Sequence, residues 1–313
     1  MLQLQTNPVI GSLNVPSTVL PYIAVGAAKR QEFQDVVDEF FTDFEAHMWI
    51  KGKAGLGKTY TVKTTADAHK TYYIEMPGRQ TIWGVMKKLS VALHTVNWPS
   101  FENKPTQKEI DSLPNVAVHF DDMTGWDDKD FINWLKIALD QAEWDQARYE
   151  VSLSAQYNQA ESWEKVAIDH FRQEQVPGLH IPFWGKVKFI FTMNHALNDD
   201  NDLEEYKERN GIKASKTIVR QMEDRAALFS RVDYVPMDLT KEECWGWLAD
   251  LTMSGNLCPG VNQNQMGEML TFLWSNWDNL RETSARSVVQ KMWRHLKKSR
   301  NGSHLNRWQQ LVK

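Results

Sequence analysis

A glycine-rich stretch early in the chain combines the residue types that bind phosphate. Residues 52 to 59 fit the pattern G-x-x-x-x-G-K-[ST] at every specified position; they are Gly52, Lys53, Ala54, Gly55, Leu56, Gly57, Lys58 and Thr59. In such a loop the backbone N–H groups point at a phosphate, the lysine adds positive charge and the hydroxyl binds Mg²⁺. A glycine-rich turn with a solvated lysine is the alternative. An apolar strand-like run before the loop and a helix-compatible run after it favour a nucleoside triphosphate site.

Two carboxylates follow a second apolar run. Val116 to Phe120 favours a strand, and Asp121 and Asp122 come at its end. In a parallel sheet, ligands bind at this end of the strands. We expect Asp121 to hold Mg²⁺ through water and Asp122 to orient or deprotonate an attacking water molecule. The alternative is an acidic pair that caps the next helix, and we interpret His119, inside the strand, as a buried histidine with satisfied hydrogen bonds.

Strands and helices alternate along the part of the chain that carries these residues, and the end of the chain is helical throughout. This order predicts a parallel α/β sheet sandwiched by helices, followed by a small all-α domain. The expected helices cover residues 28–45, 60–69, 82–93, 131–142, 161–173, 218–229, 239–255, 266–274 and 288–296, and the expected strands cover residues 48–50, 71–76, 116–122, 186–194 and 232–237.

These elements suggest three regions. Residues 1–27 contain three prolines and predict an extended arm, in which Tyr22 or Ile23 could contact a nucleotide base. Residues 28–238 form the expected α/β core, with an insertion at about residues 143–184, because a connection this long inside a compact domain is usually functional or an inserted structure. Residues 239–313 form the expected helical lid, which ends in a basic tail.

Composition narrows the classes of protein to which the chain could belong. The hydrophobic content of 42% and the charged content of 24% are ordinary for a soluble globular protein, and the net charge of −4 argues against a broadly basic nucleic-acid binder. Cys244 and Cys258 lack metal-ligand spacing, which favours a reducing compartment. No apolar run approaches ~18 residues and no signal-peptide pattern is present, so we expect a cytoplasmic protein without a membrane segment.

In their order along the chain, these landmarks resemble those of the AAA+ ATPases, over about residues 28 to 300. The phosphate loop is similar to the Walker A motif of this family without departure. Residues 116–122 are similar to Walker B, except that Asp122 stands where most members have glutamate. Because aspartate reaches one methylene less far, this departure implies slow hydrolysis or a differently held water molecule.

The resemblance extends to three single residues. Asn194, at the end of the run Thr192-Met193-Asn194, resembles the sensor-1 residue that contacts the attacking water or the γ-phosphate. Arg231 resembles the arginine finger, and Arg286 resembles the sensor-2 arginine of the lid. An arginine near a helix end is more often a solvated or dipole-complementing side chain, so the assignment depends on the order of the whole set.

Membership of this family would imply a P-loop NTPase fold, ATP and Mg²⁺ as ligands, and ATP hydrolysis. The family works as rings or spirals, so the resemblance implies a homo-oligomer, expected to be a hexamer, in which Arg231 completes the neighbour's site. A kinase or a small GTPase shares the phosphate loop. The absence of an Asn-Lys-x-Asp run and the helical lid count against both.

The substrate of such a machine stays open between different classes. A DNA-associated motor or loader, similar to clamp loaders and helicase loaders, is favoured by the basic tail, which could equally be a solvated helix face. A MoxR-like protein-remodelling chaperone with an unknown protein partner is favoured by the insertion, and an ATP-dependent switch with weak hydrolysis by Asp122. The compact chain suits a bacteriophage or mobile element. The basic residues of the tail are Arg286, Lys291, Arg294, Lys297, Lys298, Arg300, Arg307 and Lys313, interleaved with Trp293 and Trp308.

Overall fold

The contacts within the computed structural model divide the chain into two compact units. A helical unit consists of residues 1–37, 52–61 and 237–313, and a sheet unit consists of residues 38–51 and 62–236. None of the helices in the described residues is long and apolar enough to cross a lipid bilayer. The structure describes residues 15–122, 128–140, 146–150, 155–173, 178–194, 204, 207–208, 211, 215–253, 263–280, 283–285, 288 and 291–294.

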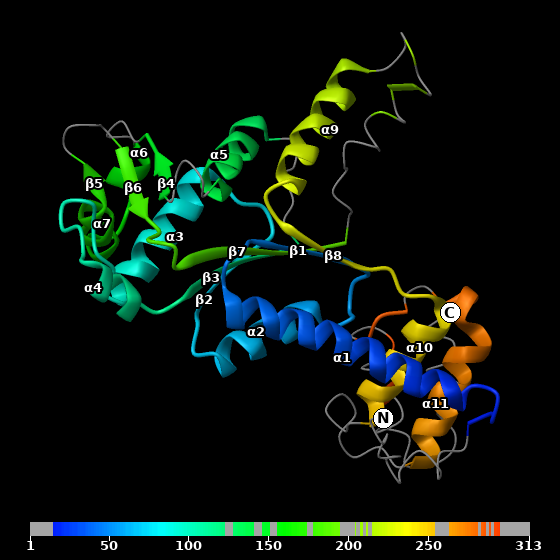
Figure 1. Ribbon diagram of the computed structural model, residues 1–313. Coiled ribbons are helices and arrows are strands. Elements are labelled where there is room, and N and C mark those ends of the chain that lie inside the picture. The colour runs from blue at the N-terminus through cyan, green and yellow to red at the C-terminus, as the bar shows by residue number, and fades with distance from the viewer. Residues whose placement is uncertain are drawn as a thin grey trace. The chain divides into compact units, whose positions relative to one another are not determined.

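Five parallel strands form the centre of the sheet unit, in the order β2-β3-β7-β1-β8. Parallel neighbours need crossover connections, which helices provide here (Figure 1). The two central strands β3 and β7 are buried along their length, which explains their nearly continuous apolar sequences. The predicted α/β class with a parallel sheet flanked by helices is confirmed. The strands are β1 (Met48–Gly52), β2 (Tyr72–Pro77), β3 (Val116–Asp121), β7 (Val187–Met193) and β8 (Asp233–Met237).

Aromatic side chains cover one face of this sheet. Trp49 and Phe120 are both register partners of Phe191, so the three rings share a face. The centroids of the Trp49 and Phe191 rings lie 5.1 Å apart, as do those of Phe120 and Phe191. The apolar sides of α3 (Ile82–Thr95) and α5 (Lys129–Leu139) belong to the same core cluster. In Figure 1 these two helices lie above the sheet and α2 (Lys58–Ala68) lies below it.

The expected insertion contains a second sheet. Strands β4 (Gln146–Tyr149), β6 (Gly178–Pro182) and β5 (Arg172–Gln173) pair antiparallel in that order. Two helices lie between β4 and β5 in sequence, α6 (Ala155–Asn158) and α7 (Ser162–His170). The helix that we expected over residues 161–173 therefore ends earlier, and its last residues form β5.

Residues 97–114, which are polar and proline-rich, are anchored to this second sheet. Trp98 is fully buried, and its indole N–H donates a hydrogen bond to the Pro182 carbonyl oxygen at 2.7 Å. The segment also contains a short helix, α4 (Gln107–Ser112), which begins at a capping box formed by Thr106 and Glu109. The buried indole of Trp98 thus anchors residues 97–114, although their composition is typical of a loop.

The first helix begins earlier than we expected. Helix α1 covers Leu20–Asp43, whereas the prolines of residues 1–27 predicted an extended arm, so that prediction is wrong for residues 20–27. Pro21 lies in the first turn of α1, where a missing backbone N–H costs no intrahelical hydrogen bond. Pro16 precedes the helix, and its carbonyl oxygen accepts a hydrogen bond from the Val19 N–H at 3.0 Å.

The helical unit packs the first part of α1 against α10 (Lys241–Met253) and α11 (Gln263–Asn276). Helix α10 begins at a capping box, in which the Thr240 N–H donates to Glu243 at 2.8 Å and the Glu243 N–H donates to Thr240 at 3.2 Å. The Trp274 ring of α11 contacts the rings of Tyr22 and Trp245 at centroid distances of 5.2 and 5.6 Å. Strand β8 (Asp233–Met237) and α9 (Lys216–Phe229) precede α10 in sequence.

Candidate nucleotide-binding site

The loop of residues 52–59 leaves the sheet at the end of β1 and enters α2 at Lys58. Gly55 and Gly57 have φ angles of +77° and +85°, in the left-handed region that favours glycine. A Cβ atom at Gly57 would meet no other atom within 4 Å, so open space lies on that side of the loop. The loop therefore has the curled backbone that phosphate-binding loops require and is open beside Gly57.

Lys58 lies inside this loop. Its Nζ donates hydrogen bonds to the carbonyl oxygens of Gly52 and Lys53, at 2.7 and 3.0 Å, and the residue is 6% exposed. Both of these acceptors are backbone atoms of the loop, so the ammonium group lies within its curve. Thr59 is the next residue of α2.

The far end of the chain contacts the same loop within the helical unit. The Ala285 N–H donates a hydrogen bond to the Gly55 carbonyl oxygen at 3.1 Å. A Cβ atom at Gly55 would lie 2.1 Å from the Ser284 Cβ, so this contact excludes any larger residue at that position. Arg286, the predicted sensor-2 arginine, directly follows Ala285 in sequence and lies outside the described residues.

In the sheet unit, the predicted acidic pair and Asn194 lie together at the carboxyl edge of the sheet. Asp121 ends β3, and one of its oxygens accepts a hydrogen bond from the Thr192 hydroxyl at 2.8 Å. Asp122 has a φ of +46°, and its N–H donates to the Thr192 carbonyl oxygen at 3.0 Å. The Asn194 amide donates to an Asp122 oxygen at 3.0 Å. One carboxylate and one amide are thus joined directly at this edge of the sheet.

His119 is fully buried beside this edge, as we expected. Its Nε2 lies 2.8 Å from the Thr192 Oγ1, and its Nδ1 is hydrogen-bonded to the Tyr73 hydroxyl. Burial lowers the pKa of His119 to about 4, although the nearby Asp121 carboxylate acts in the opposite direction. No motif in the sequence points to Tyr73 as part of the site. The alternation of polar and apolar residues could have indicated that Tyr73 lies on the same face of the sheet as Asp121. Polar side chains stand at every second position of two apolar strands: Tyr73 and Glu75 in β2, and His119 and Asp121 in β3.

Arg231, the predicted arginine finger, contacts residues of its own chain. It follows the C-cap of α9, and its guanidinium donates to the Ala227 carbonyl oxygen at 2.5 Å and forms an ion pair with Asp140 at 3.3 Å. Asp140 directly follows α5. The side chains of Arg231 and Asp140 are 29% and 30% exposed. Partly solvated pairs of this kind contribute about 0–1 kcal/mol, so the contact can be exchanged for another anionic partner.

The donor set of the predicted Mg²⁺ site consists of oxygen atoms. Thr59 offers a hydroxyl and Asp121 a carboxylate, both of which suit this hard cation. Within the described part of the chain, no group of three or more His, Cys, Asp and Glu residues could hold a metal ion by itself. Mg²⁺ usually combines one or two carboxylates with water and substrate phosphates, so this donor set fits a nucleotide-bound ion.

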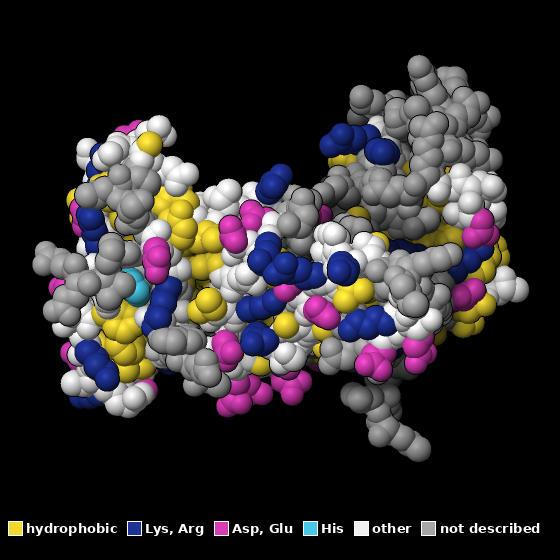
Figure 2. Space-filling view, turned by 90° about the horizontal axis from the view of Figure 1, so that it is seen from above, with side chains coloured by type: hydrophobic (Ala, Val, Ile, Leu, Met, Phe, Trp, Pro, Cys, Tyr) yellow, Lys and Arg dark blue, Asp and Glu magenta, His cyan; other side chains and the backbone are white. Residues whose placement is uncertain are grey.

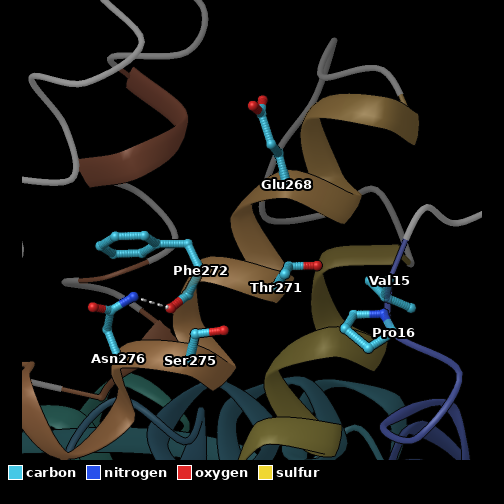
Figure 3. A pocket seen from close by; sticks show the side chains of 7 residues that line it. All are labelled: Val15, Pro16, Glu268, Thr271, Phe272, Ser275 and Asn276. Carbon is cyan, nitrogen blue, oxygen red and sulfur yellow. Dashed lines mark hydrogen bonds between the residues drawn. The ribbon is translucent and has the colours of Figure 1, made fainter.

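A separate pocket of about 590 Å³ lies in the helical unit (Figure 3). Val15 and Pro16 line one side of it, and residues of α11 line the other: Glu268, Thr271, Phe272, Ser275 and Asn276. The Asn276 amide donates to the Phe272 carbonyl oxygen at 3.0 Å, and so it braces α11. None of these lining residues carries a positive charge, and Glu268 would repel a phosphate. The pocket does not include any residue of the phosphate loop.

The chain matches no protein-family model, and no curated protein is significantly similar to it. A proposal for its function therefore depends on its own residues and their geometry.

Proposed function

We propose that the chain binds ATP with Mg²⁺ at residues 52–59 and hydrolyses it. The observation that carries this proposal is the loop itself: two glycines with positive φ, open space beside Gly57 and the ammonium group of Lys58 inside the curve. The loop follows a buried strand of a parallel sheet and opens a helix, which is the context that distinguishes a phosphate loop from a chance match.

Each residue then has a role that its chemistry allows. The loop N–H groups and Lys58 bind the phosphates, and Thr59 and Asp121 hold the metal ion. Asp122 accepts a proton from, or orients, the attacking water molecule, and Asn194 orients both Asp122 and that water. When bound, Mg²⁺ supplies positive charge against the phosphate oxygens in the transition state.

We further propose the P-loop architecture of an AAA+ ATPase, in which residues 239–313 serve as the lid. The hydrogen bond between Ala285 and Gly55 supports this proposal, because it joins the residue before Arg286 to the phosphate loop. Arg286 would then act on the bound γ-phosphate. Arg231 would act on the site of a neighbouring copy in a ring or spiral homo-oligomer, which we expect to be a hexamer.

Binding of a fluorescent ATP analogue tests the site. Lys58→Ala should weaken binding about 10- to 100-fold, the range expected for the loss of a charge-assisted hydrogen bond. Lys63→Ala is the matched control, because Lys63 is an exposed lysine on the same helix. Equal affinities of the Lys58→Ala variant and the wild type would refute the proposed site. Binding without hydrolysis would leave an ATP-dependent switch.

Two features of the described residues bear on whether the proposed ATPase acts on DNA or on a protein. Lys291 and Arg294 of the basic tail are exposed, which supports a DNA-associated motor or loader, whereas residues 295–313 lie outside the described residues. On the face shown in Figure 2, Lys and Arg side chains lie next to Asp and Glu side chains. In the insertion, Trp163 and Val166 of α7 are 61% and 58% exposed, which supports a MoxR-like chaperone that binds a protein client.

The rate of ATP hydrolysis with and without DNA, at two salt concentrations, separates these two roles. Contacts to phosphates release counterions, so stimulation by DNA should fall steeply as salt rises if the chain is a DNA motor. A protein-remodelling ATPase should show no such stimulation, and Trp163→Ser should lower its response to a client protein.

A further inference from the structure

Four polar side chains form one continuous hydrogen-bonded series across β2, β3 and β7. Tyr73 is the register partner of Ala117, which precedes His119 and Asp121 by two and four residues, and Thr192 is the register partner of Asp121. Because side chains alternate between faces and register partners share a face, all four side chains lie on one face of the sheet. The aromatic cluster of Trp49, Phe120 and Phe191 occupies the other face.

The carboxylate at the end of this series determines which group donates and which accepts in each of its hydrogen bonds. An ionised carboxylate can only accept, so the Thr192 hydroxyl donates its hydrogen to Asp121 at 2.8 Å. The Thr192 oxygen then accepts from the His119 Nε2–H, also at 2.8 Å. A neutral imidazole with its proton on Nε2 accepts at Nδ1, so Tyr73 donates its hydroxyl proton there. Every donor in the series therefore points toward Asp121.

The middle of the series is closed to solvent. His119 and Thr192 are both fully buried, whereas Asp121 lies at the edge of the sheet and is partly exposed. The single hydroxyl hydrogen of Thr192 is directed at Asp121 because His119 occupies the oxygen lone pair on the other side. Without His119, that hydroxyl could rotate and donate elsewhere. The series thus directs the Thr192 hydroxyl group to one oxygen of Asp121.

We propose that Tyr73, His119 and Thr192 are positioning residues that orient Asp121 toward Mg²⁺. This inference rests on the proposed ATP site, and it assigns a function to the three side chains that lie behind Asp121 on this face of the sheet. Hydrogen-bonded partners of metal ligands commonly change metal affinity about 10- to 100-fold when they are removed. The series should therefore affect the metal ion and leave binding of the metal-free nucleotide unchanged.

The test compares nucleotide binding in EDTA with binding in a Mg²⁺ titration, using a fluorescent ATP analogue. Thr192→Val should weaken the apparent Mg²⁺ affinity about 10-fold or more, and Tyr73→Phe should weaken it by a smaller factor, because Tyr73 acts through two intermediates. Affinity in EDTA should not change. Thr192→Ser keeps the hydroxyl group that Thr192→Val removes, so it should keep the Mg²⁺ affinity of the wild type. Tyr72→Phe is the matched control, because Tyr72 is the preceding residue of β2 and faces the other side of the sheet.

The outcomes separate this inference from the proposed function. If Mg²⁺ affinity is the same in the wild type, Tyr73→Phe and Thr192→Val, the positioning role is wrong while ATP binding stands. If the wild type binds no ATP analogue at all, both proposals fail. Thermal unfolding of each variant identifies any loss of fold. Should Thr192→Val not fold, the conservative pair Tyr73→Phe and Thr192→Ser still decides the outcome.

Discussion

Asp122 has a backbone conformation that most side chains avoid. Its φ of +46° lies in the left-handed region, where Asp and Asn are the most common non-glycine residues. Asp122→Asn therefore keeps the turn and an acceptor for the Asn194 amide, while it removes the negative charge. We expect ATP binding to persist and phosphate release to fall about 10²-fold or more, as for the loss of a general base. Undiminished phosphate release would mean that Asp122 only shapes the turn.

His47 should make the stability of the protein depend on pH. It is 2% exposed, and its Nδ1 accepts a hydrogen bond from the Phe189 N–H at 3.0 Å. Burial and the nearby Lys188 lower its pKa from 6.5 to about 3. Between these values the unfolded chain binds a proton that the folded chain does not, so the free energy of unfolding falls as pH falls below about 6.5.

The slope contributed by His47 should be about 1.4 kcal/mol per pH unit at most. Urea unfolding between pH 7 and pH 4.5 measures it. His47→Gln should lower stability at pH 7, because the imidazole is buried, and it should also flatten the slope. The slope that remains belongs to other groups, His119 among them. An unchanged slope in the variant would contradict the assignment.

The candidate site residues that are predictable from the sequence are those whose chemistry is local. Two short motifs are of this kind, residues 52–59 and the pair Asp121 and Asp122, and each comes at the end of a recognisable apolar strand. The partners of Asp121 are not local, because Tyr73 and Thr192 reach it through strand order and register. A single sequence specifies neither of these, since a shift of one residue moves every side chain to the other face.

At the scale of elements, α1 and α10 approach each other more closely than side chains allow. A Cβ atom at Gly246 would lie 1.8 Å from the Tyr22 carbonyl oxygen, and one at Gly26 would lie 2.0 Å from the Gly246 carbonyl carbon. Arg30 of α1 and Asp250 of α10 form an ion pair at 2.6 Å beside this crossing. The two glycines therefore determine how these helices pack.

Gly246→Ala should destabilise the protein in spite of the higher helix propensity of alanine. The added methyl group meets backbone atoms that cannot rotate away, so we expect a loss of about 1–3 kcal/mol or more, as for other overpacked sites. Chemical denaturation measures this loss. Gly84→Ala, in the first turn of α3, is the contrasting change, because the closest atom to its Cβ would be the Thr81 hydroxyl oxygen at 3.1 Å. Equal stability of the two variants would argue against a tight crossing.

The elements themselves were predictable to different degrees. The strands of the central sheet read as apolar runs because burial on both faces requires them. The antiparallel strands β4, β5 and β6 are short and carry polar residues such as Gln146, Arg172 and His180, so they produced no strand signal. The predicted start of α1 is wrong because Pro21 lies in the first turn of the helix, where a proline is tolerated.

For the whole molecule, the proposed assembly depends on Arg231. This side chain pairs with Asp140 of its own chain. Because the pair is partly solvated, breaking it costs little free energy. If Arg231 serves a neighbour's site, Arg231→Ala should reduce turnover while ATP binding largely remains, because the guanidinium stabilises the transition state.

Mixing two inactive variants tests that arrangement. Arg231→Ala and Lys58→Ala subunits, when combined, create some interfaces with an intact nucleotide site and an intact Arg231, so part of the ATPase rate should return. Size-exclusion chromatography must show that the two variants co-assemble. No recovery despite co-assembly would count against action between subunits, and a fully active Arg231→Ala variant would exclude it.

The tight crossing of α1 and α10 also has a consequence for biosynthesis. The ion pair beside it joins residues that are 220 positions apart in the chain. At a synthesis rate of about 5–20 residues per second, α1 leaves the ribosome roughly 10–40 s before its partner helix exists. During this interval Val19, Ile23 and Phe33, which are buried in the finished protein, have no α10 to cover them. The face of α1 that contacts α10 therefore stays uncovered during this interval, and a chaperone that shields it would raise the yield of folded protein.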